Sequence, residues 1–140
     1  MFCREVDFLQ KVVVFHPTNP DKFLAIHRSA NDTTRPNDWD LVGGHVSFGE
    51  NNEESLRREA KEEAGIRIQN LIPVQVTTIY HQEKKIYKLF IGYIGFAQTE
   101  IIRLSHEHDA YLWVSSKEFN KLTSTQFLLD LVLAATKKVI

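Results

Sequence analysis

Stretches of β-branched and apolar residues, separated by polar turns, run along most of the chain. They predict strands at residues 8–16, 22–28, 68–81, 85–96 and 111–114. Shorter extended pieces are expected at 39–41 and 44–46, and residues 82–84 are expected to join two long strands into a hairpin. This order indicates a mixed α/β chain, although periodicity alone does not show which strands pair in parallel.

The clearest helical pattern covers residues 53–64, between two asparagines and a glycine. Asn51 or Asn52 can cap the start of this helix, and Gly65 can close its end in a left-handed conformation. Its narrow apolar stripe consists of Leu56, Ala60 and Ala64. We expect this stripe to pack against the sheet.

Two more helices are expected after the last strand. Ser115 or Ser116 can open a short one, and residues 124–137 predict a closing helix. The side chains of this closing helix available for the core are Phe127, Leu128, Leu131 and Leu133.

Beside the apolar stripe, Glu59, Glu62 and Glu63 lie three and four residues apart and therefore share an arc of the helix. Like charges at this spacing destabilise an isolated helix, so the cluster favours a bound counter-charge. Carboxylate oxygens suit Mg²⁺, or Mn²⁺ in its place, and the absence of neighbouring thiolates or a histidine cluster argues against structural zinc. The alternative interpretation is an acidic face exposed to solvent.

Fixed spacing around the cluster favours the catalytic interpretation. Gly44, Glu50, Arg58, the three glutamates and Gly65 stand at set distances, and such a match arises by chance on the order of once in 10⁸ starting points. The loop at 43–51 holds three of the six glycines, so its backbone can approach a ligand closely. Arg58 is expected to orient one of the three glutamates through a forked hydrogen bond.

The segments Gly44-His-Val-Ser-Phe-Gly-Glu50 and Arg58-Glu-Ala-Lys-Glu-Glu-Ala-Gly-Ile66 resemble the signature box of the Nudix hydrolases. The box covers 23 of 140 residues, and Ala60 departs from it because the family often has a bulkier aliphatic there. The resemblance implies an α/β (α+β) fold, an α/β/α sandwich with a central mixed sheet, over one domain at 1–140. It also implies Mg²⁺-assisted attack of water on a phosphorus atom of a nucleoside diphosphate linked to another group.

The resemblance also assigns roles to individual residues. It implies that Glu59, Glu62 and Glu63 bind metal, that Gly44 lends its carbonyl oxygen, and that Glu62 or Glu59 acts as the general base. Related enzymes often have a further acidic ligand before the last strand, for which Glu107 is the candidate and Glu100 the competitor. His106 and His108 flank Glu107, and they are expected to be ordinary loop histidines because their spacing is not that of a helical zinc motif.

Three residues before the box are candidates for substrate binding. Arg28 and Arg35 can each hold a phosphate group through paired hydrogen bonds, although a solvated surface charge explains either one equally well. Trp39 can stack on a base, but packing at the sheet edge is the simpler role.

Composition agrees with a small soluble enzyme, and the resemblance implies a small-molecule nucleotide as its substrate. The net charge is −1, with 17 basic and 18 acidic residues, so neither nucleic acid nor a membrane is an expected partner. The single cysteine, Cys3, cannot form an internal disulfide, and the chain has no signal-peptide pattern, so we expect it in the cytoplasm. Dimers are common among the proteins it resembles, so the sequence leaves the oligomeric state open, with a homodimer as one alternative.

The sequence specifies the substrate less closely than it specifies the fold or the site. The segments at 35–39 and 107–113 resemble their counterparts in hydrolases of nucleoside triphosphates and of GDP-mannose, and the intact box favours a nucleoside triphosphate or a nucleotide-sugar. The rival is a non-catalytic module that senses nucleotides, which would not need to retain every metal-binding glutamate.

Overall fold

The apolar run that ends β1 (Val6–Phe15) lies at the centre of the sheet. In the computed structural model, which describes residues 2 and 5–139, the side chains of this run alternate between two cores. Val12 and Val14 belong to one core, whereas Val13 and Phe15 belong to the other. Because both faces of this strand are covered, its sequence is continuously apolar rather than alternating.

The other elements agree with the predicted order. The strands are β2 (Phe23–Arg28), β3 (Trp39–Asp40), β4 (Val42–His45), β5 (Ile68–His81), β6 (Ile86–Ala97) and β7 (His108–Val114), and the helices are α1 (Asn52–Ala64), α2 (Ser116–Phe119) and α3 (Gln126–Val139). The sheet has the order β3-β2-β1-β6-β5, with β4 also paired to β1 and β7 to β2. β1 and β6 run parallel, and the other pairs are antiparallel, so the sheet is mixed as expected.

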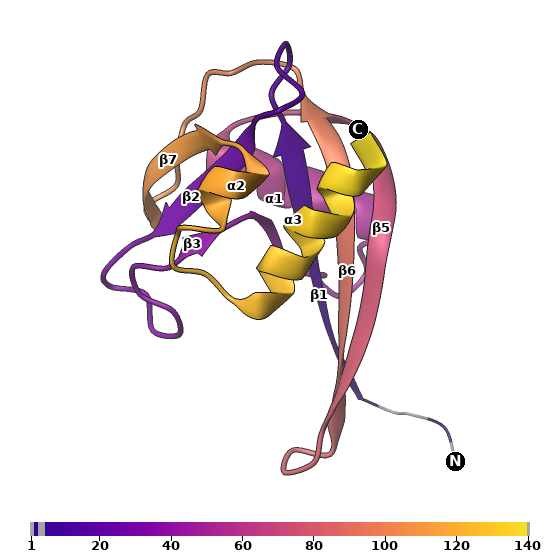
Figure 1. Ribbon diagram of the computed structural model, residues 1–140. Helices are drawn as coiled ribbons and strands as arrows, with labels where there is room; N and C mark the ends of the chain where they lie inside the picture. The colour runs from indigo at the N-terminus through magenta and orange to yellow at the C-terminus, as the bar shows by residue number, and fades with distance from the viewer. Residues whose placement is uncertain (1, 3–4, 140) are drawn as a thin grey trace.

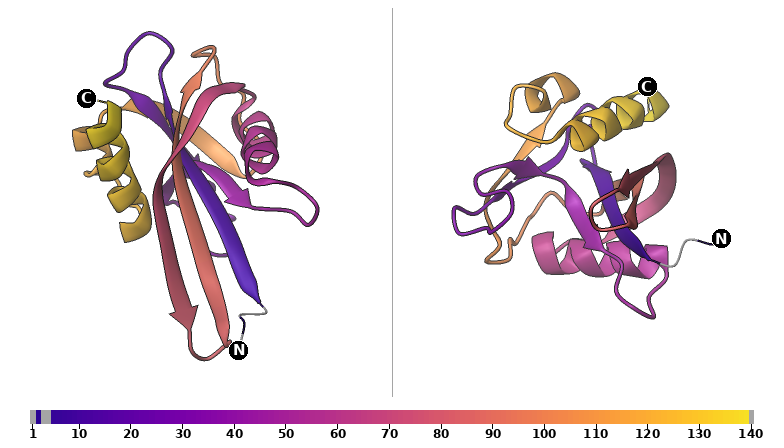
Figure 2. Two further views of the ribbon diagram at one scale, coloured as in Figure 1. Left: turned by 90° about the vertical axis from the view of Figure 1, so that its right-hand side faces the viewer. Right: turned by 90° about the horizontal axis from the view of Figure 1, so that it is seen from below.

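Helices cover both faces of this sheet. α1 lies on one side, and α2 and α3 lie on the other (Figures 1 and 2). The predicted stripe of α1 is completely buried in the first core, and Leu128 and Leu131 of α3 are buried in the second. The α/β/α arrangement is therefore confirmed.

Both ends of α1 have the predicted caps. The side chain of Asn51 accepts a hydrogen bond from the Glu54 backbone N–H, and the Glu54 carboxylate accepts one from the Asn51 N–H in return. Gly65 closes the helix in the left-handed conformation. Since both termini of α1 are fixed, the position of the glutamates along its last two turns is fixed as well.

Two details of the last third of the chain differ from the prediction. β7 begins at His108 rather than at residue 111, because its first residues pair with the end of β2 across an irregular step in register. Leu133 was expected in the core, but it is 54% exposed. The buried face of α3 instead continues from Leu131 through Val132 and Ala135.

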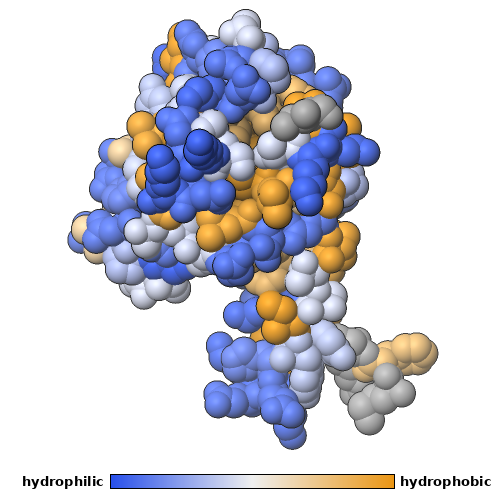
Figure 3. Space-filling view, viewed as in Figure 1, coloured by the Kyte–Doolittle hydropathy of each residue, from blue (hydrophilic) through white to orange (hydrophobic). Residues whose placement is uncertain are grey.

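β5 and β6 extend beyond the body of the sheet as a ribbon, with the start of β1 beside them (Figure 1). The turn at 82–85 is exposed, and the end of the ribbon is mostly hydrophilic (Figure 3). Across residues 2 and 5–139, no helix has the length and apolar character needed to cross a membrane. Cys3 lies outside the described residues.

Candidate active site

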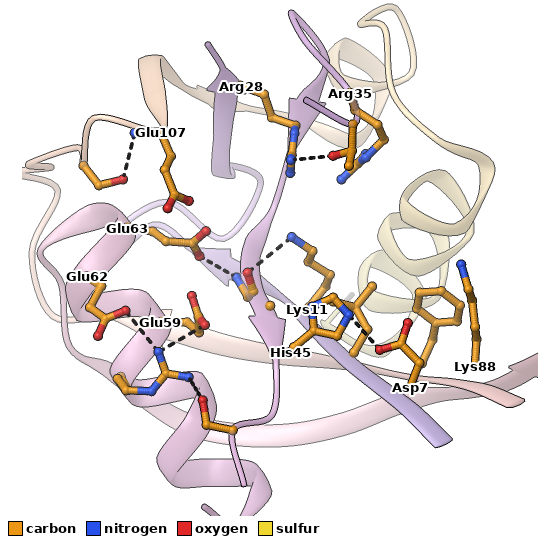
Figure 4. A pocket seen from close by; sticks show the side chains of 18 of the residues that line it. Asp7, Lys11, Arg28, Arg35, His45, Glu59, Glu62, Glu63, Lys88 and Glu107 are labelled. Carbon is orange, nitrogen blue, oxygen red and sulfur yellow. Dashed lines mark hydrogen bonds and ion pairs between the residues drawn. The ribbon is translucent and has the colours of Figure 1, made fainter. Parts of the chain in front are cut away.

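A cavity of about 740 Å³ lies where α1, β4 and the loop before β7 meet the central strands. Glutamates from α1 and from the loop line one side, and basic side chains from β1, β2 and the following loop line another (Figure 4). Lys88 and Phe90 of the β6 ribbon complete the wall. The cavity therefore combines groups that bind cations with groups that bind anions.

Glu63 is the most deeply buried of the three box glutamates. Only 8% of its surface is exposed, and one of its carboxylate oxygens accepts a hydrogen bond of 2.9 Å from the Gly43 N–H. Burial raises the pKa of Glu63 to about 8, against the opposing effect of the nearby Lys11 charge. An ionised Glu63 would therefore be stabilised strongly by a cation in the cavity.

Gly43 allows this contact because no other residue fits its position. Its φ is 140°, and a Cβ atom there would lie 2.1 Å from the carbonyl oxygen of Gln10 in the paired strand β1. At the neighbouring Gly44, a Cβ atom would lie 2.9 Å from a carboxylate oxygen of Glu59. The predicted glycine loop thus brings backbone and glutamates together, and the role of the Gly44 carbonyl stays a prediction.

Glu59 and Glu62 lie closer to solvent than Glu63. The side chain of Glu59 is 17% exposed and that of Glu62 is 60% exposed. Burial raises the pKa of Glu59 above its ordinary value, and the neighbouring Glu62 charge raises it further, whereas Arg58 lowers it. The cluster therefore runs from a buried carboxylate to an exposed one.

Arg58 has a different partner from the one predicted. Its forked hydrogen bond goes to Glu50, with Nε at 2.7 Å from one oxygen and Nη2 at 3.0 Å from the other, and not to one of the three helical glutamates. Its Nη1 atom lies 3.0 Å from Glu62 and 3.2 Å from Glu59. Glu50 therefore fixes the guanidinium of Arg58 beside the three glutamates. The fixed place of Glu50 in the signature box could have indicated this positioning role.

The choice between the two candidate loop acids follows from their positions. Glu107 lines the cavity, and one oxygen of its carboxylate lies within 4.8 Å of a carboxylate oxygen of Glu63 and of a ring nitrogen of His108. Glu100 does not line the cavity and instead forms an ion pair of 2.7 Å with His16. The geometry therefore favours Glu107 over Glu100 as the additional acidic ligand.

The expectation that His108 is an ordinary loop histidine is wrong. It is the first residue of β7, only 5% of it is exposed, and burial lowers its pKa. The sequence missed it because Glu63, whose carboxylate lies close to its ring, is 45 positions away, on α1. His106 does lie in the loop, as expected, and it is exposed.

A buried acid connects the basic groups of the cavity. Asp40 is completely buried and lies 3.1 Å from Lys11, 2.8 Å from Arg28 and 3.1 Å from Arg35. Burial alone would raise its pKa, but the Lys11 and Arg35 charges and hydrogen bonds from Lys11 and Arg28 hold the pKa of Asp40 below its ordinary value. Asp40 and Lys11 were not predicted as part of the site.

The three predicted substrate-binding residues separate into two groups. Arg28 and Arg35 both line the cavity, although Asp40 and, for Arg28, Asp32 also accept hydrogen bonds from them. Trp39 does not line it, because its ring packs against His27 and the second core. The structure therefore gives Trp39 the simpler packing role.

A family model of the NUDIX domain matches residues 8–133 of this chain. The chain belongs to this family. A similar curated relative is the nucleoside triphosphatase NudI of Salmonella arizonae, which is 29% identical over 110 residues, 72% of this chain and 78% of the relative. The asymmetrical bis(5'-nucleosyl)-tetraphosphatase of Mus musculus is 33% identical over 85 residues, 57% of each chain.

A MutT protein from Methanosarcina mazei has a similar fold, with a TM-score of 0.74 at 23% identity, over 99% of this chain and 98% of that one. Family membership makes the present protein a Nudix hydrolase that acts on phosphoric anhydride bonds.

The donors of this Nudix site fit a divalent cation. The site offers carboxylate oxygens from Glu59, Glu62, Glu63 and Glu107, the hard ligands that Mg²⁺ and Mn²⁺ prefer. The buried Glu63 has no ion-pair partner among the residues that the structure describes, and Lys11 directs its ammonium group to Asp40 and to two carbonyl oxygens. A cation at the cluster would therefore pair directly with Glu63, which no basic side chain of the described residues does.

Proposed function

We propose that this Nudix hydrolase is a Mg²⁺-dependent pyrophosphohydrolase of nucleoside triphosphates. The supporting observation is that one cavity combines four glutamates with Lys11, Arg28 and Arg35. A triphosphate chain complexed with Mg²⁺ needs both, because oxygens not bound to the metal still require cationic partners. The relative from Salmonella arizonae is named a nucleoside triphosphatase, which agrees with this choice.

The residues of the cavity have distinct roles in this proposal. Glu62, Glu63 and Glu107 hold the metal, which when bound neutralises phosphate charge and makes a bound water more acidic, and Glu59 is left to accept a proton. Arg28 and Arg35 donate hydrogen bonds to the phosphate oxygens. Arg58, fixed by Glu50, holds the outer glutamates in place.

Glu59 is the better of the two candidates for the general base. Its pKa is raised by burial, which makes it a stronger acceptor near neutral pH than an exposed carboxylate such as Glu62. It takes one proton from the attacking water, the new P–O bond forms, and the anhydride P–O bond breaks. The products are a nucleoside monophosphate and pyrophosphate.

A substrate panel tests this function. The purified 140-residue chain is incubated in Mg²⁺ with one compound at a time from a panel of ribo- and deoxyribonucleoside triphosphates, ADP-ribose and GDP-mannose, and the products are separated by ion-exchange chromatography. We expect the highest kcat/KM for a triphosphate, with release of pyrophosphate. Preference for GDP-mannose would show the nucleotide-sugar alternative instead. Measurable nucleotide binding without turnover of any compound would identify a sensor and overturn the proposal.

The metal role of Glu107 has a matched control in the chain. We expect Glu107→Gln to raise the Mg²⁺ concentration for half-maximal activity by about tenfold or more, a loss typical of damage to a metal site. Glu100→Gln removes an acid of the same region that lies outside the cavity, so its Mg²⁺ dependence should equal that of the wild type. An unchanged Mg²⁺ requirement in Glu107→Gln would remove Glu107 from the site.

We also propose that the enzyme works in the cytoplasm, in agreement with a sequence that contains a single cysteine.

A further inference from the structure

His108 is a buried polar side chain that the proposed reaction does not use. Only 5% of it is exposed, and neither ring nitrogen has a hydrogen-bond partner among the residues that the structure describes. Buried polar side chains are almost always hydrogen-bonded, and leaving such a group unpaired costs about 1–3 kcal/mol. The side chain therefore indicates a ligand that is not part of the chain.

The surroundings of His108 indicate which kind of ligand this is. One ring nitrogen of His108 lies within 4.8 Å of a carboxylate oxygen of Glu63 and of a carboxylate oxygen of Glu107, and these two oxygens also lie within 4.8 Å of each other. Two carboxylate oxygens and an imidazole nitrogen this close together are stabilised by a positive charge between them. The nearby Lys11 and Arg28 do not supply it, since both donate to Asp40.

The dimensions of the group suit a metal ion. Divalent cations bind nitrogen and carboxylate oxygen at about 2.0–2.2 Å, so two ligands on opposite sides of an ion lie about 4–4.5 Å apart. The three donors come from α1, from the loop and from the first residue of β7, and the strand pairing of β7 with β2 fixes the histidine. Only small side-chain movements are needed to bring all three to one ion.

We propose that a ring nitrogen of His108 binds a divalent cation directly, together with Glu63 and Glu107. This proposal extends the metal site of the proposed function by a nitrogen ligand, which the box glutamates do not provide. Imidazole suits Mn²⁺, Co²⁺ or Zn²⁺ better than Mg²⁺, which strongly prefers oxygen. We therefore expect one position of the site to bind Mn²⁺ more tightly than Mg²⁺.

Mn²⁺ alone is the probe for this ligand, without any nucleotide. The metal-free 140-residue chain is loaded with Mn²⁺ and studied by pulsed electron paramagnetic resonance, which detects the coupling of a directly bound ¹⁴N nucleus. We expect this coupling in the wild type and its loss in His108→Asn. Titration calorimetry should show that the Kd for Mn²⁺ rises about tenfold or more in His108→Asn, whereas the Kd for Mg²⁺ changes much less.

His106→Asn is the matched control, since His106 lies two residues away, lines the cavity and is exposed. It should retain the ¹⁴N coupling and the Mn²⁺ affinity of the wild type. If His108→Asn does not fold, as judged by circular dichroism, labelling the wild type, His106→Asn and His45→Asn with ¹⁵N-histidine decides the matter, because His45 also lines the cavity. A ¹⁵N signal in all three proteins supports His108, and its absence in any of them overturns the proposal.

The outcomes separate this proposal from the proposed function. Bound Mn²⁺ without nitrogen coupling, or coupling that persists in a folded His108→Asn, overturns the nitrogen ligand and leaves hydrolysis intact. Nitrogen coupling together with inactivity on the whole substrate panel overturns the function and leaves the ligand intact. Failure of Mn²⁺ to bind overturns the ligand proposal, whatever the panel shows.

Discussion

Glu63→Gln should abolish almost all hydrolysis while preserving the fold. The amide has the shape of the carboxylate, and its oxygen can still accept the hydrogen bond from the Gly43 N–H. The substitution removes the negative charge from the most buried position of the proposed metal site. We expect kcat/KM for a nucleoside triphosphate to fall by about 10²–10³-fold or more, as when a single electrostatic stabiliser of the transition state is removed. Steady-state kinetics over a range of Mg²⁺ concentrations measure this loss.

The stability of the metal-free protein gives an independent check on Glu63. Because burial raises the pKa of Glu63 from 4.5 to about 8 in the folded state, the stability of the metal-free protein falls as pH rises from about 4.5 to about 8 and changes little above 8. In EDTA, the Tm of the wild type should therefore fall relative to that of Glu63→Gln over this pH range. If Tm depends on pH in the same way in the wild type and in Glu63→Gln, the raised pKa of Glu63 is contradicted.

Glu53→Gln is the control for both measurements. Glu53 is an exposed acid in the first turn of the same helix and does not line the cavity. Its substitution removes one charge from α1 without touching the site, so kcat/KM and the pH dependence should match the wild type. Near wild-type turnover in Glu63→Gln would contradict the metal role of Glu63.

Local patterns predicted the part of the site that lies on one helix. The spacing of Glu59, Glu62 and Glu63 determines their common arc, and the caps at Asn51 and Gly65 determine where that arc lies along the chain. These features depend on neighbours within a few residues, which a sequence shows directly. The mixed sheet and its pairing could not be obtained in this way and came from the resemblance.

Contacts between distant segments were the part that the sequence did not reveal. Arg58 has Glu59 and Glu62 beside it on its own helix, yet its forked bond reaches back to Glu50 in the loop before the helix. His108 looked like a loop residue because its burial depends on β2 and α1, which are far away in sequence. Periodicity identifies the buried face of an element, but it does not identify the partner of a polar side chain.

Lys11 and Asp40 show the same limit most clearly. Lys11 precedes the apolar run of β1, and Asp40 follows Trp39 in a short strand, so each could have been a surface charge. They form a buried ion pair because β3 and β4 lie beside the central strands. Such pairs are costly to form and costly to break, which makes them good targets for measurement.

Asp40→Asn should destabilise the protein by about 3–5 kcal/mol, because removing one partner of a buried ion pair leaves the other charge uncompensated. Here one carboxylate forms ion pairs with three cations, of which Lys11 is the most buried, with 6% of its side chain exposed. Urea unfolding followed by circular dichroism measures the loss. Since the pKa of Asp40 is lowered in the folded state, the ionised carboxylate contributes fully to the free energy of unfolding above pH 3.8, and this contribution is lost at lower pH. The difference between the variant and the wild type should therefore narrow below pH 3.8.

Two further variants distinguish the effect of breaking the buried ion pair from the effect of removing any one charge. Asp38→Asn removes an acid from the same segment whose side chain makes no ion pair among the described residues, so its stability should stay within about 0.5 kcal/mol of the wild type.

Adding Lys11→Met to Asp40→Asn removes the stranded buried cation and should restore part of the stability, because an apolar side chain of similar length takes its place. Arg28 and Arg35 would remain without Asp40, but they are 18% and 27% exposed and are better hydrated than Lys11. A double variant less stable than Asp40→Asn alone would show that Lys11 stabilises the fold mainly through the carbonyl oxygens of Leu41 and Gly43 rather than through Asp40.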